Sequence, residues 1–387
     1  MTTPDKLVLL TNVPTPYRIP FFNALNEVLL DYGASLSVLY CAEREPHRHW
    51  EIRLDDQRFA WRILPGAHPS LKGWYPHLNP AIRRTLRELQ PRWLLVAGAW
   101  NTPTMLLTIP RGSAHSRSRI FWSEGHADAV LHAEGLIASA RRRVLGTYDA
   151  FAVPNRRSAD FIRLEIGERA VILPLPNTVD DTLFGGAFEG DRSLIRRRYG
   201  MPEGRTVFTV VAQLEEKKGV CELSEAFEKL TPDERRKTAL VFVGDGSLKQ
   251  QLNRKAEASD PGILLLVGQL PQAAVRDVLA ASDVFILPTK RDPNPLSPIE
   301  AAFMGLPLII SRQAGNALDL VRDGENGYLL ETVTPDAIAS RVRAFIQCDP
   351  ATHRAMGRLS REIAENGFRT DAVARHFVEA LLAAVPA

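Results

Sequence analysis

Cysteine is scarce in this sequence, which has three cysteines, Cys41, Cys221 and Cys348, among 387 residues. Their wide spacing fits neither a metal site nor a disulfide framework, so we expect structural thiols in a reducing cytoplasm. Long apolar runs are also missing, and none approaches the ~18 residues that a membrane span requires. The first residues carry one lysine before a short apolar run, so we expect a first strand there and not a signal peptide.

A strong charge imbalance is absent as well, since 48 Lys and Arg face 45 Asp and Glu. The distribution is uneven: residues 1–175 hold 22 basic against 16 acidic side chains, and the remainder holds 26 against 29. No nucleic-acid-binding module or interleaved aromatic pattern accompanies the basic excess, so we predict no nucleic-acid partner. The basic excess is better explained by peripheral contact with an anionic membrane surface or by binding of a pyrophosphate-bearing acceptor. A solvated basic face is the plain alternative.

The order of apolar and amphipathic segments predicts an α/β protein. A chain of this length normally forms two domains, and 45% hydrophobic with 24% charged residues is typical of globular proteins. Short apolar runs alternate with helical patterns in both halves, which favours parallel sheets with right-handed crossovers. We expect strands at 7–10, 36–40, 93–97, 120–122, 150–153, 170–173, 207–211, 240–243, 263–267, 284–287 and from 308 onward.

Residues 282–311, SDVFILPTKRDPNPLSPIEAAFMGLPLIIS, are predicted to form strand, loop, helix, turn and strand. The strand ends at Pro288, and the polar, proline-rich residues 290–295 form the loop. Ser297 is predicted to cap the helix, with Pro298 at its first position and Glu300 as capping-box partner.

The loop–helix junction within this stretch is a candidate nucleotide-sugar site. A helix amino end offers unpaired N–H groups and partial positive charge to a phosphate. Asp292 and Glu300 flank that junction, and their carboxylates could accept hydrogen bonds from hydroxyl groups. The alternative is structural: Glu300 caps its helix and Asp292 lies on a surface loop.

The two acids with seven residues between them, followed by EAAFMGLPLIIS, resemble the nucleotide-sugar-binding signature of retaining GT-B glycosyltransferases of the GT4 type. Three more segments resemble that family: VVAQLEEKKGV (210–220), VFVGDGSLKQQL (241–252) and GNALDLVRDGENGYLL (315–330). The resemblance covers residues 206–330 and is weaker in the amino-terminal half. It implies two Rossmann-like domains facing a central cleft, with the last helix crossing back to the first domain.

The resemblance assigns donor-side roles in the carboxy-terminal half. Lys218 would neutralise the leaving diphosphate, Glu300 would hold the nucleotide ribose, and Asp292 would bind donor-sugar hydroxyls. The family's usual arginine is replaced by Gln213, which brings no charge, and Ala212 stands for its glycine. Lys217, Lys290, Arg291 and Arg312 are candidates to compensate. The remaining predicted donor contacts are Gly244, Asn294, Leu296 and Ser297.

The loop after the first strand departs from the family's glycine-rich form. Residues 14–20 contain three prolines, which predicts an extended loop followed by a helix. In its TPYR segment, Arg18 is a candidate diphosphate contact that would replace glycine amides, and Tyr17 is a candidate acceptor contact. Arg18 could equally be a surface residue at a helix start.

Acceptor-side residues are expected in the amino-terminal half. Glu124 and His126 follow the strand at 120–122, and the resemblance places a histidine here close to donor sugar and acceptor. Its imidazole could bind a hydroxyl or relay a proton; a loop histidine without a role is the alternative. Residues 42–75 are expected to form an irregular hairpin or acceptor-facing loop, whose Trp50, Trp61 and Trp74 suit sugar or lipid contact or ordinary packing.

These features predict an acceptor-binding domain at 1–175 with the crossover helix 370–387, and a nucleotide-sugar-binding domain at 176–369. We predict a cytoplasmic, metal-independent hexosyltransferase that uses a UDP- or GDP-linked sugar as donor substrate, has no separate cofactor, and acts on a glycan or lipid-linked acceptor. Asp180-Asp181 is assigned to the linker and not to a metal site. Domain closure would exclude water. A nucleotide-sugar-binding protein without transfer activity, and a GT-B epimerase or hydrolase, remain alternatives.

Overall fold

The computed structural model describes residues 5–45, 54–70, 75–109, 118–127, 130 and 134–385. The chain divides into two compact units. Unit 1 comprises Met1–Thr178 and Thr370–Ala387, and unit 2 comprises Val179–Arg369. The sequence placed the division at 175/176 and 369/370, and the acceptor and donor roles given to the two parts stay predictions.

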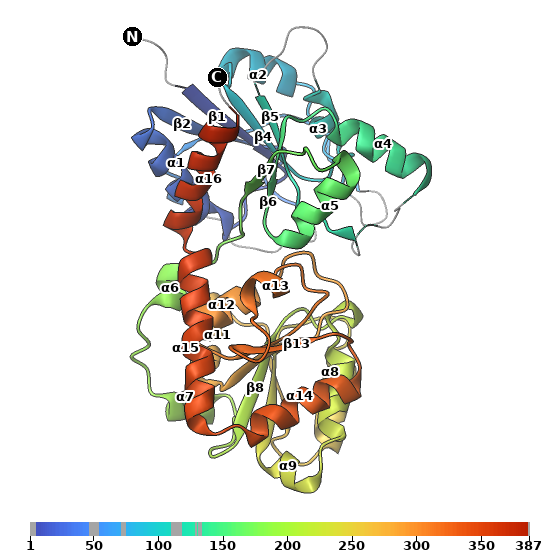
Figure 1. The fold of residues 1–387 in the computed structure, drawn as a ribbon, viewed down its shortest axis with the longest axis vertical. Helices are drawn as coiled ribbons and strands as arrows, with labels where there is room; N and C mark the ends of the chain where they lie inside the picture. The colour runs from blue at the N-terminus through green and yellow to red at the C-terminus, as the bar shows by residue number, and fades with distance from the viewer. Residues whose placement is uncertain are drawn as a thin grey trace. The chain divides into compact units, whose positions relative to one another are not determined.

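Unit 1 is built on a seven-stranded parallel sheet with the order β3-β2-β1-β4-β5-β6-β7 (Figure 1). Its strands are β1 (Asp5–Thr11), β2 (Ala34–Tyr40), β3 (Ala60–Ile63), β4 (Trp93–Ala97), β5 (Ser118–Trp122), β6 (Ala150–Val153) and β7 (Ile172–Pro174). Its helices are α1 (Arg18–Asp31), the 3-10 turn η1 (Leu54–Asp56), α2 (Ile82–Leu89), α3 (Pro103–Leu107), α4 (Gly135–Leu145), α5 (Arg156–Ile166) and α16 (Thr370–Ala384).

The last helix returns to unit 1, as predicted. Figure 1 shows α16 beside α1, and α16 also contacts β7. Phe377, Val378 and Leu381 of α16 are completely buried in the same core as Leu25 of α1. The carboxy-terminal helix therefore completes a core that the first residues of the chain begin.

Unit 2 contains a six-stranded parallel sheet with the order β10-β9-β8-β11-β12-β13. Its strands are β8 (Thr206–Val211), β9 (Thr238–Val243), β10 (Leu264–Gly268), β11 (Val284–Leu287), β12 (Leu308–Ser311) and β13 (Gly327–Leu330). Its helices are α6 (Asp181–Gly185), α7 (Arg192–Arg198), η3 (Glu216–Lys218), α8 (Val220–Glu228), α9 (Pro232–Arg236), α10 (Lys249–Ala258), α11 (Gln272–Ala281), α12 (Ser297–Phe303), α13 (Ala317–Leu320), α14 (Pro335–Gln347) and α15 (Pro350–Gly367).

The central strands of both sheets are mostly buried, as expected for parallel sheets. Every residue of β4, β9 and β11 is buried, which is typical of parallel strands covered by helices on both faces. In unit 2, α14 packs on α8, and α15 packs on α12. Because all strands of a sheet run the same way, the loops that follow them emerge along one edge, where open α/β sheets bind ligands.

Three local predictions are wrong. The described part of residues 42–75 holds η1 and β3, and β3 extends the sheet in parallel beside β2, so it is not a hairpin. Its Trp61 is 39% exposed, whereas Trp50 and Trp74 lie outside the described residues. Helix α1 begins at Arg18, because Pro20 lies in the first turn, where a missing N–H costs nothing. The sequence also predicts Ser158 as the cap of the helix that follows residues 150–153, but this helix, α5, is capped by Asn155.

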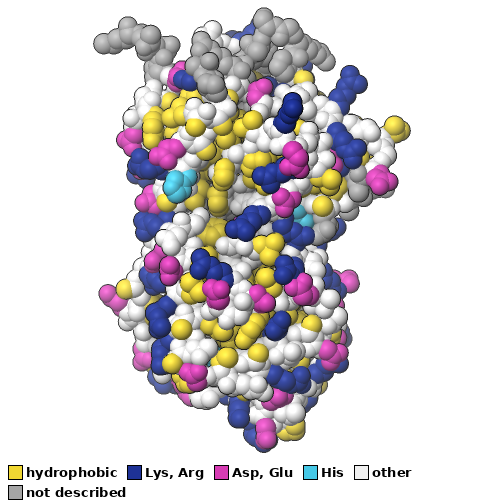
Figure 2. All heavy atoms as spheres, viewed as in Figure 1, with side chains coloured by type: hydrophobic (Ala, Val, Ile, Leu, Met, Phe, Trp, Pro, Cys, Tyr) yellow, Lys and Arg dark blue, Asp and Glu magenta, His cyan; other side chains and the backbone are white. Residues whose placement is uncertain are grey.

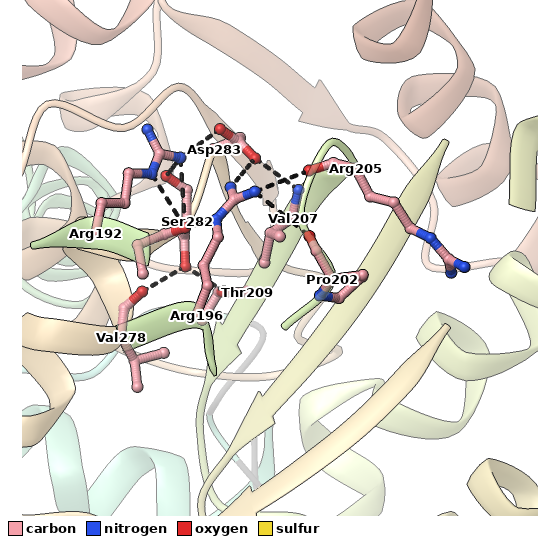
Figure 3. A network of polar contacts seen from close by, with 10 residues as sticks. Arg192, Arg196, Pro202, Arg205, Val207, Thr209, Val278, Ser282 and Asp283 are labelled. Carbon is pink, nitrogen blue, oxygen red and sulfur yellow. Dashed lines mark hydrogen bonds and ion pairs between the residues drawn. The ribbon is translucent and has the colours of Figure 1, made fainter. Parts of the chain in front are cut away.

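A buried polar network fixes the amino ends of β8 and β11 (Figure 3). The Asp283 carboxylate accepts hydrogen bonds from Arg192 (2.5 Å), Arg196 (2.8 Å) and the backbone N–H of Val207 (2.7 Å). The Arg196 guanidinium also donates to the Ala281 carbonyl at 3.0 Å. The network thus holds α7 to the sheet at the edge opposite the ligand-binding loops.

Basic and acidic side chains are interspersed over the face seen in Figure 2, in keeping with the near balance of charge. Among the helices of the described residues, none combines the length and the apolar character that crossing a membrane demands.

We expect Asp283→Ala to lower the free energy of unfolding by about 2 kcal/mol, because it leaves the buried Arg196 guanidinium without its carboxylate. Urea unfolding curves measure this effect. The matched control is Asp260→Ala, which removes a 63%-exposed side chain 3.5 Å from Arg235 and should change stability by less than about 0.5 kcal/mol. Equal losses in both variants would contradict the role given to the network.

Candidate functional site

In unit 2, an ion pair joins the two loops at the topological switch point of the sheet. The strand order reverses between β8 and β11, and the loops after these strands carry Lys218 and Asp292. The Lys218 ammonium donates to an Asp292 carboxylate oxygen, and the side chains are 14% and 11% exposed. Switch points are where doubly wound sheets bind ligands, so the structure brings these two predicted residues together at the expected position.

Hydrogen bonds keep both loops in place. The Lys217 carbonyl accepts from the Thr289 hydroxyl at 2.9 Å and from the Lys290 N–H at 2.8 Å. On the other side, Gly315 N–H donates to the Asp292 carbonyl at 2.9 Å. The Asn316 amide, which sequence reasoning missed, donates to the Pro295 carbonyl at 2.7 Å. Asn316 is completely buried just before α13, and because its burial depends on tertiary packing, the sequence carries no signal that identifies it.

The capping box predicted for α12 is wrong. Ser297 is already the first helical residue, Leu296 is the N-cap, and no side chain caps the helix. The N–H groups of Ile299 and Glu300 both donate to the Leu296 carbonyl, and Pro298 has no N–H. A ligand at this helix end would therefore meet the N–H groups of Leu296 and Ser297, both predicted donor contacts.

Glu300, whose side chain makes no capping hydrogen bond, lies in the first turn of the same helix. Its side chain keeps part of its surface exposed. Burial of the carboxyl group raises its pKa to about 7, because loss of hydration disfavours the ionised form. Ligand hydroxyl groups that donate to this carboxyl would favour its ionised form.

Three further predicted donor residues lie in the neighbouring loops. Gln213 is exposed after β8 and donates no charge to the site. Gly244 follows β9 at a φ of +146°, and a Cβ there would lie 1.9 Å from the Ala212 carbonyl oxygen. Gly244 is therefore required by the close approach of two backbones, whatever it contributes to binding. Asn294 is half-buried between Asp292 and α12.

Of the four cations that could compensate for Gln213, three are engaged by carboxylates. Lys217 pairs with Glu215 (2.7 Å), Lys290 with Glu222 (2.7 Å) and Arg312 with Glu331 (2.5 Å). The Glu222 carboxylate raises the pKa of Lys290. The fourth, Arg291, is exposed, and its guanidinium has no carboxylate partner within the described part of the chain. Its backbone N–H bonds to the Lys217 carbonyl at 3.3 Å, so it lies beside the Lys218 loop.

In unit 1, a pocket of about 270 Å³ lies at the corresponding switch point, between β1 and β4. Its walls come from the loops after β1, β4 and β5 and from the start of α1. The lining residues are Thr11, Asn12, Val13, Thr15, Tyr17, Arg18, Ala97, Gly98, Trp122, Glu124 and Gly125. Three predicted residues, Tyr17, Arg18 and Glu124, are thus brought to one cavity.

Arg18 and Glu124 form an ion pair in this pocket. The Arg18 guanidinium donates to Glu124 Oε1 at 2.8 Å, and the Asn177 amide donates to the same oxygen at 3.1 Å. The guanidinium carbon lies 4.7 Å from the Trp122 ring centroid, a cation–π distance. Arg18 is therefore neutralised within unit 1, and its predicted diphosphate contact stays a prediction.

The same pocket contains polar atoms that sequence reasoning missed. Among the described residues, Asn12 Oδ1, Thr15 Oγ1 and Trp122 Nε1 are buried without a hydrogen-bond partner. Thr15 and Trp122 are each only 4% exposed. Such atoms ordinarily have partners, so they indicate a ligand or ordered water. Asn12 and Thr15 follow the first strand directly, a position that could have marked them from sequence.

His126 is placed differently from Glu124. Its side chain is only 1% exposed, and the pocket is lined by Glu124 and Gly125 but not by His126. The role predicted for it in acceptor binding or proton relay therefore remains a prediction.

The described residues contain no group of three or more His, Cys, Asp or Glu side chains arranged to hold a metal ion. Asp180, from the acidic pair assigned to the linker, instead caps α6 by accepting from the Leu183 N–H at 2.9 Å.

Comparison with known proteins gives a family match in unit 2. Residues 191–365 match the family model described as glycosyl transferases group 1. Among curated proteins, the chain is 32% identical over 203 residues to the UDP-Gal:alpha-D-GlcNAc-diphosphoundecaprenol alpha-1,3-galactosyltransferase of Escherichia coli, covering 50% of this chain and 49% of the relative. It is 26% identical over 204 residues to the N-acetyl-alpha-D-glucosaminyl L-malate synthase of Bacillus anthracis, covering 52% and 51%. These matches span about half the length of the relatives.

Solved structures match over nearly the whole chain. One is the Anabaena protein Alr3699/HepE in complex with UDP and glucose, with a TM-score of 0.73 and 15% identity over 98% of this chain and 100% of the other. Another is a glycosyltransferase from Rickettsia africae ESF-5, with a TM-score of 0.76 and 13% identity over 99% of each chain. At these identities the likeness shows the fold.

The predicted fold and family are thereby confirmed. The chain has the GT-B fold, with two Rossmann-like domains, and its residues 191–365 belong to the glycosyl transferases group 1 family.

Proposed function

We propose that the protein is a retaining glycosyltransferase that moves a sugar from a nucleotide-diphosphate sugar to a hydroxyl acceptor. The observation that carries the proposal is the Lys218–Asp292 ion pair at the switch point of unit 2, one loop away from Glu300. The loops after β8 and β11 thus hold a cation for a diphosphate and a carboxylate for sugar hydroxyls, and the first turn of α12 holds a second carboxylate for the ribose.

Lys218 stabilises the leaving diphosphate in this proposal. A lysine ammonium has three N–H donors, and one is used by Asp292. The other two can bind phosphate oxygens without breaking the ion pair. The N–H groups of Leu296 and Ser297 supply further donors, and such preorganised donors stabilise charge that develops as the sugar leaves.

The two carboxylates bind hydroxyl groups. Asp292 accepts hydrogen bonds from hydroxyls of the donor sugar, while Glu300 accepts them from the ribose. At position 292 this chain has Asp where the family more often has Glu. The side chain is shorter by one methylene group, so its carboxylate reaches less far, and this affects which donor sugar is preferred. Unit 1 binds the acceptor, through Tyr17 and Glu124 in its pocket and with His126 as the candidate relay.

We place the reaction in cell-envelope polysaccharide or glycolipid assembly, with a UDP- or GDP-linked hexose as donor and no metal or separate cofactor. The support is the activity for which relatives are named, such as the galactosyltransferase that acts on a diphosphoundecaprenol-linked sugar and a GDP-mannose-dependent mannosyltransferase of Mycolicibacterium smegmatis. A cytoplasmic enzyme with peripheral contact to an anionic membrane suits such an acceptor.

A binding protein without transfer activity is the second candidate, because Gln213 is exposed and uncharged where the family has an arginine. Incubation with a panel of nucleotide-sugars and glycan acceptors separates the two. Acceptor-dependent release of UDP or GDP supports transfer. Nucleotide binding without release supports the binding protein, and release without any acceptor indicates a hydrolase.

We expect Glu300→Ala to reduce transfer by about a hundredfold or more and to weaken nucleotide binding, because the ribose loses its anchor. Initial rates and calorimetric titration with UDP or GDP measure both effects. Glu325→Ala, at an exposed turn of the same unit, is the control and should behave like the parent. Parent-like transfer by Glu300→Ala would contradict the site.

Lys218→Ala should lower kcat by about 10²–10³-fold while changing the KM for the nucleotide-sugar much less, because its charge acts on the negative charge that develops on the leaving group. Steady-state kinetics with unfolding curves separates this from loss of structure. The matched control is Lys249→Ala, another lysine of unit 2 paired with an aspartate, Asp245, at 2.6 Å. If the two variants turned over alike, Lys218 would have no catalytic role.

Nucleotide affinity should rise with pH through neutrality in a manner that depends on Glu300. Its pKa of about 7 leaves the carboxyl largely protonated at about pH 6 and ionised at about pH 8, and ribose hydroxyls bind the ionised form. The ratio of parent to Glu300→Gln affinity should therefore increase about tenfold across this interval. Protonation of the nucleotide phosphates affects both proteins alike, so its effect on affinity cancels in the ratio. Parallel pH profiles for both proteins would refute the assignment.

Arg291 is proposed as the cation that replaces the family's arginine. Arg291→Gln should weaken UDP or GDP binding several-fold, and more at low salt, because an exposed charge is screened. Arg312→Gln is the control, since Arg312 is already paired with Glu331. Titrations at two salt concentrations test this, and equal effects of the two substitutions would remove Arg291 from the site.

A further inference from the structure

A second cavity adjoins the polar pocket of unit 1. It has a volume of about 370 Å³, and its walls are formed by β5, α4, α5 and the loop after β4. Gly98, Trp122, Glu124 and Gly125 line both cavities, so the two share a wall. Together they fall within the ~300–1,000 Å³ typical of small-molecule sites.

The two cavities differ in chemistry. Three residues that line the first cavity, Asn12, Thr15 and Trp122, each carry a buried polar atom (Oδ1, Oγ1 and Nε1) that has no hydrogen-bond partner among the described residues. Glu124 Oε2 adds an acceptor, since both bonds to this carboxylate from described residues go to Oε1. The second cavity is lined mainly by carbon, from Trp100, Phe121, Val130, Ile137, Leu145 and Phe161.

The arginine that lines each cavity is paired with a glutamate. In the polar pocket, Arg18 is paired with Glu124 at 2.8 Å. In the apolar pocket, the buried Arg141 guanidinium forms two bonds with the Glu165 carboxylate, at 2.8 and 3.0 Å. Uncharged donors and acceptors match hydroxyl groups, whereas a phosphate needs an excess of positive charge.

We propose that unit 1 binds a neutral amphiphilic acceptor: a sugar ring in the polar pocket, joined through an uncharged linkage to an apolar aglycone in the adjoining pocket. The inference rests on the proposed function and narrows its acceptor class to neutral glycosides, which excludes the diphosphate-linked kind of acceptor named for the galactosyltransferase relative. Trp122 lies at the junction, since it lines both cavities, and its buried Nε1 has no hydrogen-bond partner among the described residues. Gly98 shapes the polar side, because a Cβ there would lie 2.9 Å from Asn12 Oδ1.

Binding of matched glycosides tests the proposal. The probes are methyl and octyl glycosides of glucose, galactose, mannose and N-acetylglucosamine, below the micellar concentration, together with the corresponding sugar 1-phosphates. The octyl form of the preferred sugar should bind on the order of tenfold more tightly than the methyl form, because burial of a few methylene groups has that effect. The sugar 1-phosphate should bind no more tightly than the methyl glycoside.

Surface variants assign the apolar part. Ile137→Asp and Ala99→Asp each place a charge on the wall of the apolar cavity at a position exposed enough to tolerate it, and should remove the octyl advantage. Leu136→Asp is the matched control, since Leu136 precedes Ile137 on α4, is 90% exposed and does not line the cavity. Thr15→Val should weaken both glycosides by a similar factor and leave their ratio unchanged.

The outcomes separate this inference from the proposed function. Equal binding of methyl and octyl glycosides, an octyl advantage that survives in Ile137→Asp and Ala99→Asp, or tighter binding of a sugar 1-phosphate would each overturn the amphiphilic acceptor. Nucleotide binding and transfer to the methyl glycoside would in that case leave the glycosyltransferase intact. Failure of the protein to bind UDP or GDP would instead contradict the proposed function.

Discussion

The parallel direction of the strands in both sheets is the constraint on which the site depends. It sends the loops after β8 and β11 to one edge of unit 2 and those after β1, β4 and β5 to one edge of unit 1. Ligand-facing residues can then come from distant parts of the chain, as with Lys218 and Asp292. At the opposite edge of unit 2, the Asp283 network fixes the amino ends of the same two strands. Contacts that stabilise the fold therefore lie at one end of β8 and β11, and the candidate ligand-binding residues lie at the other end.

Charge is distributed differently over the two candidate sites. In unit 2 Lys218 is paired with Asp292, but the loop after β11 adds the exposed Arg291, which has no carboxylate partner among the described residues, and α12 adds Glu300, whose pKa is raised by burial. This set suits an anionic nucleotide with hydroxyl groups. In unit 1 the charges of Arg18 and Arg141 are each matched by a glutamate. The contrast favours a charged donor on unit 2 and a neutral acceptor on unit 1.

Much of the fold followed from sequence because parallel buried strands leave short apolar runs and helices leave periodic ones. Lys218 and Asp292 were found because each lies just after such a run, and Glu300 because it lies in the first turn of the helix that follows the second loop, while their roles came from the family resemblance. The capping of α12 was not, since whether Ser297 precedes the helix or begins it is decided by backbone angles at Leu296. The pairing of Arg18 with Glu124, 106 residues apart, and the unpartnered atoms of Asn12 and Thr15 depend on tertiary packing, which no local pattern records.

The most direct test of the central claim is an experimental structure of the protein with UDP or GDP bound. The account predicts the ribose hydroxyls on the Glu300 carboxylate and the diphosphate between the Lys218 ammonium and the N–H groups of Leu296 and Ser297. A nucleotide that occupies the pocket beside Arg18 and Trp122, or any other place away from the loops after β8 and β11, would contradict it.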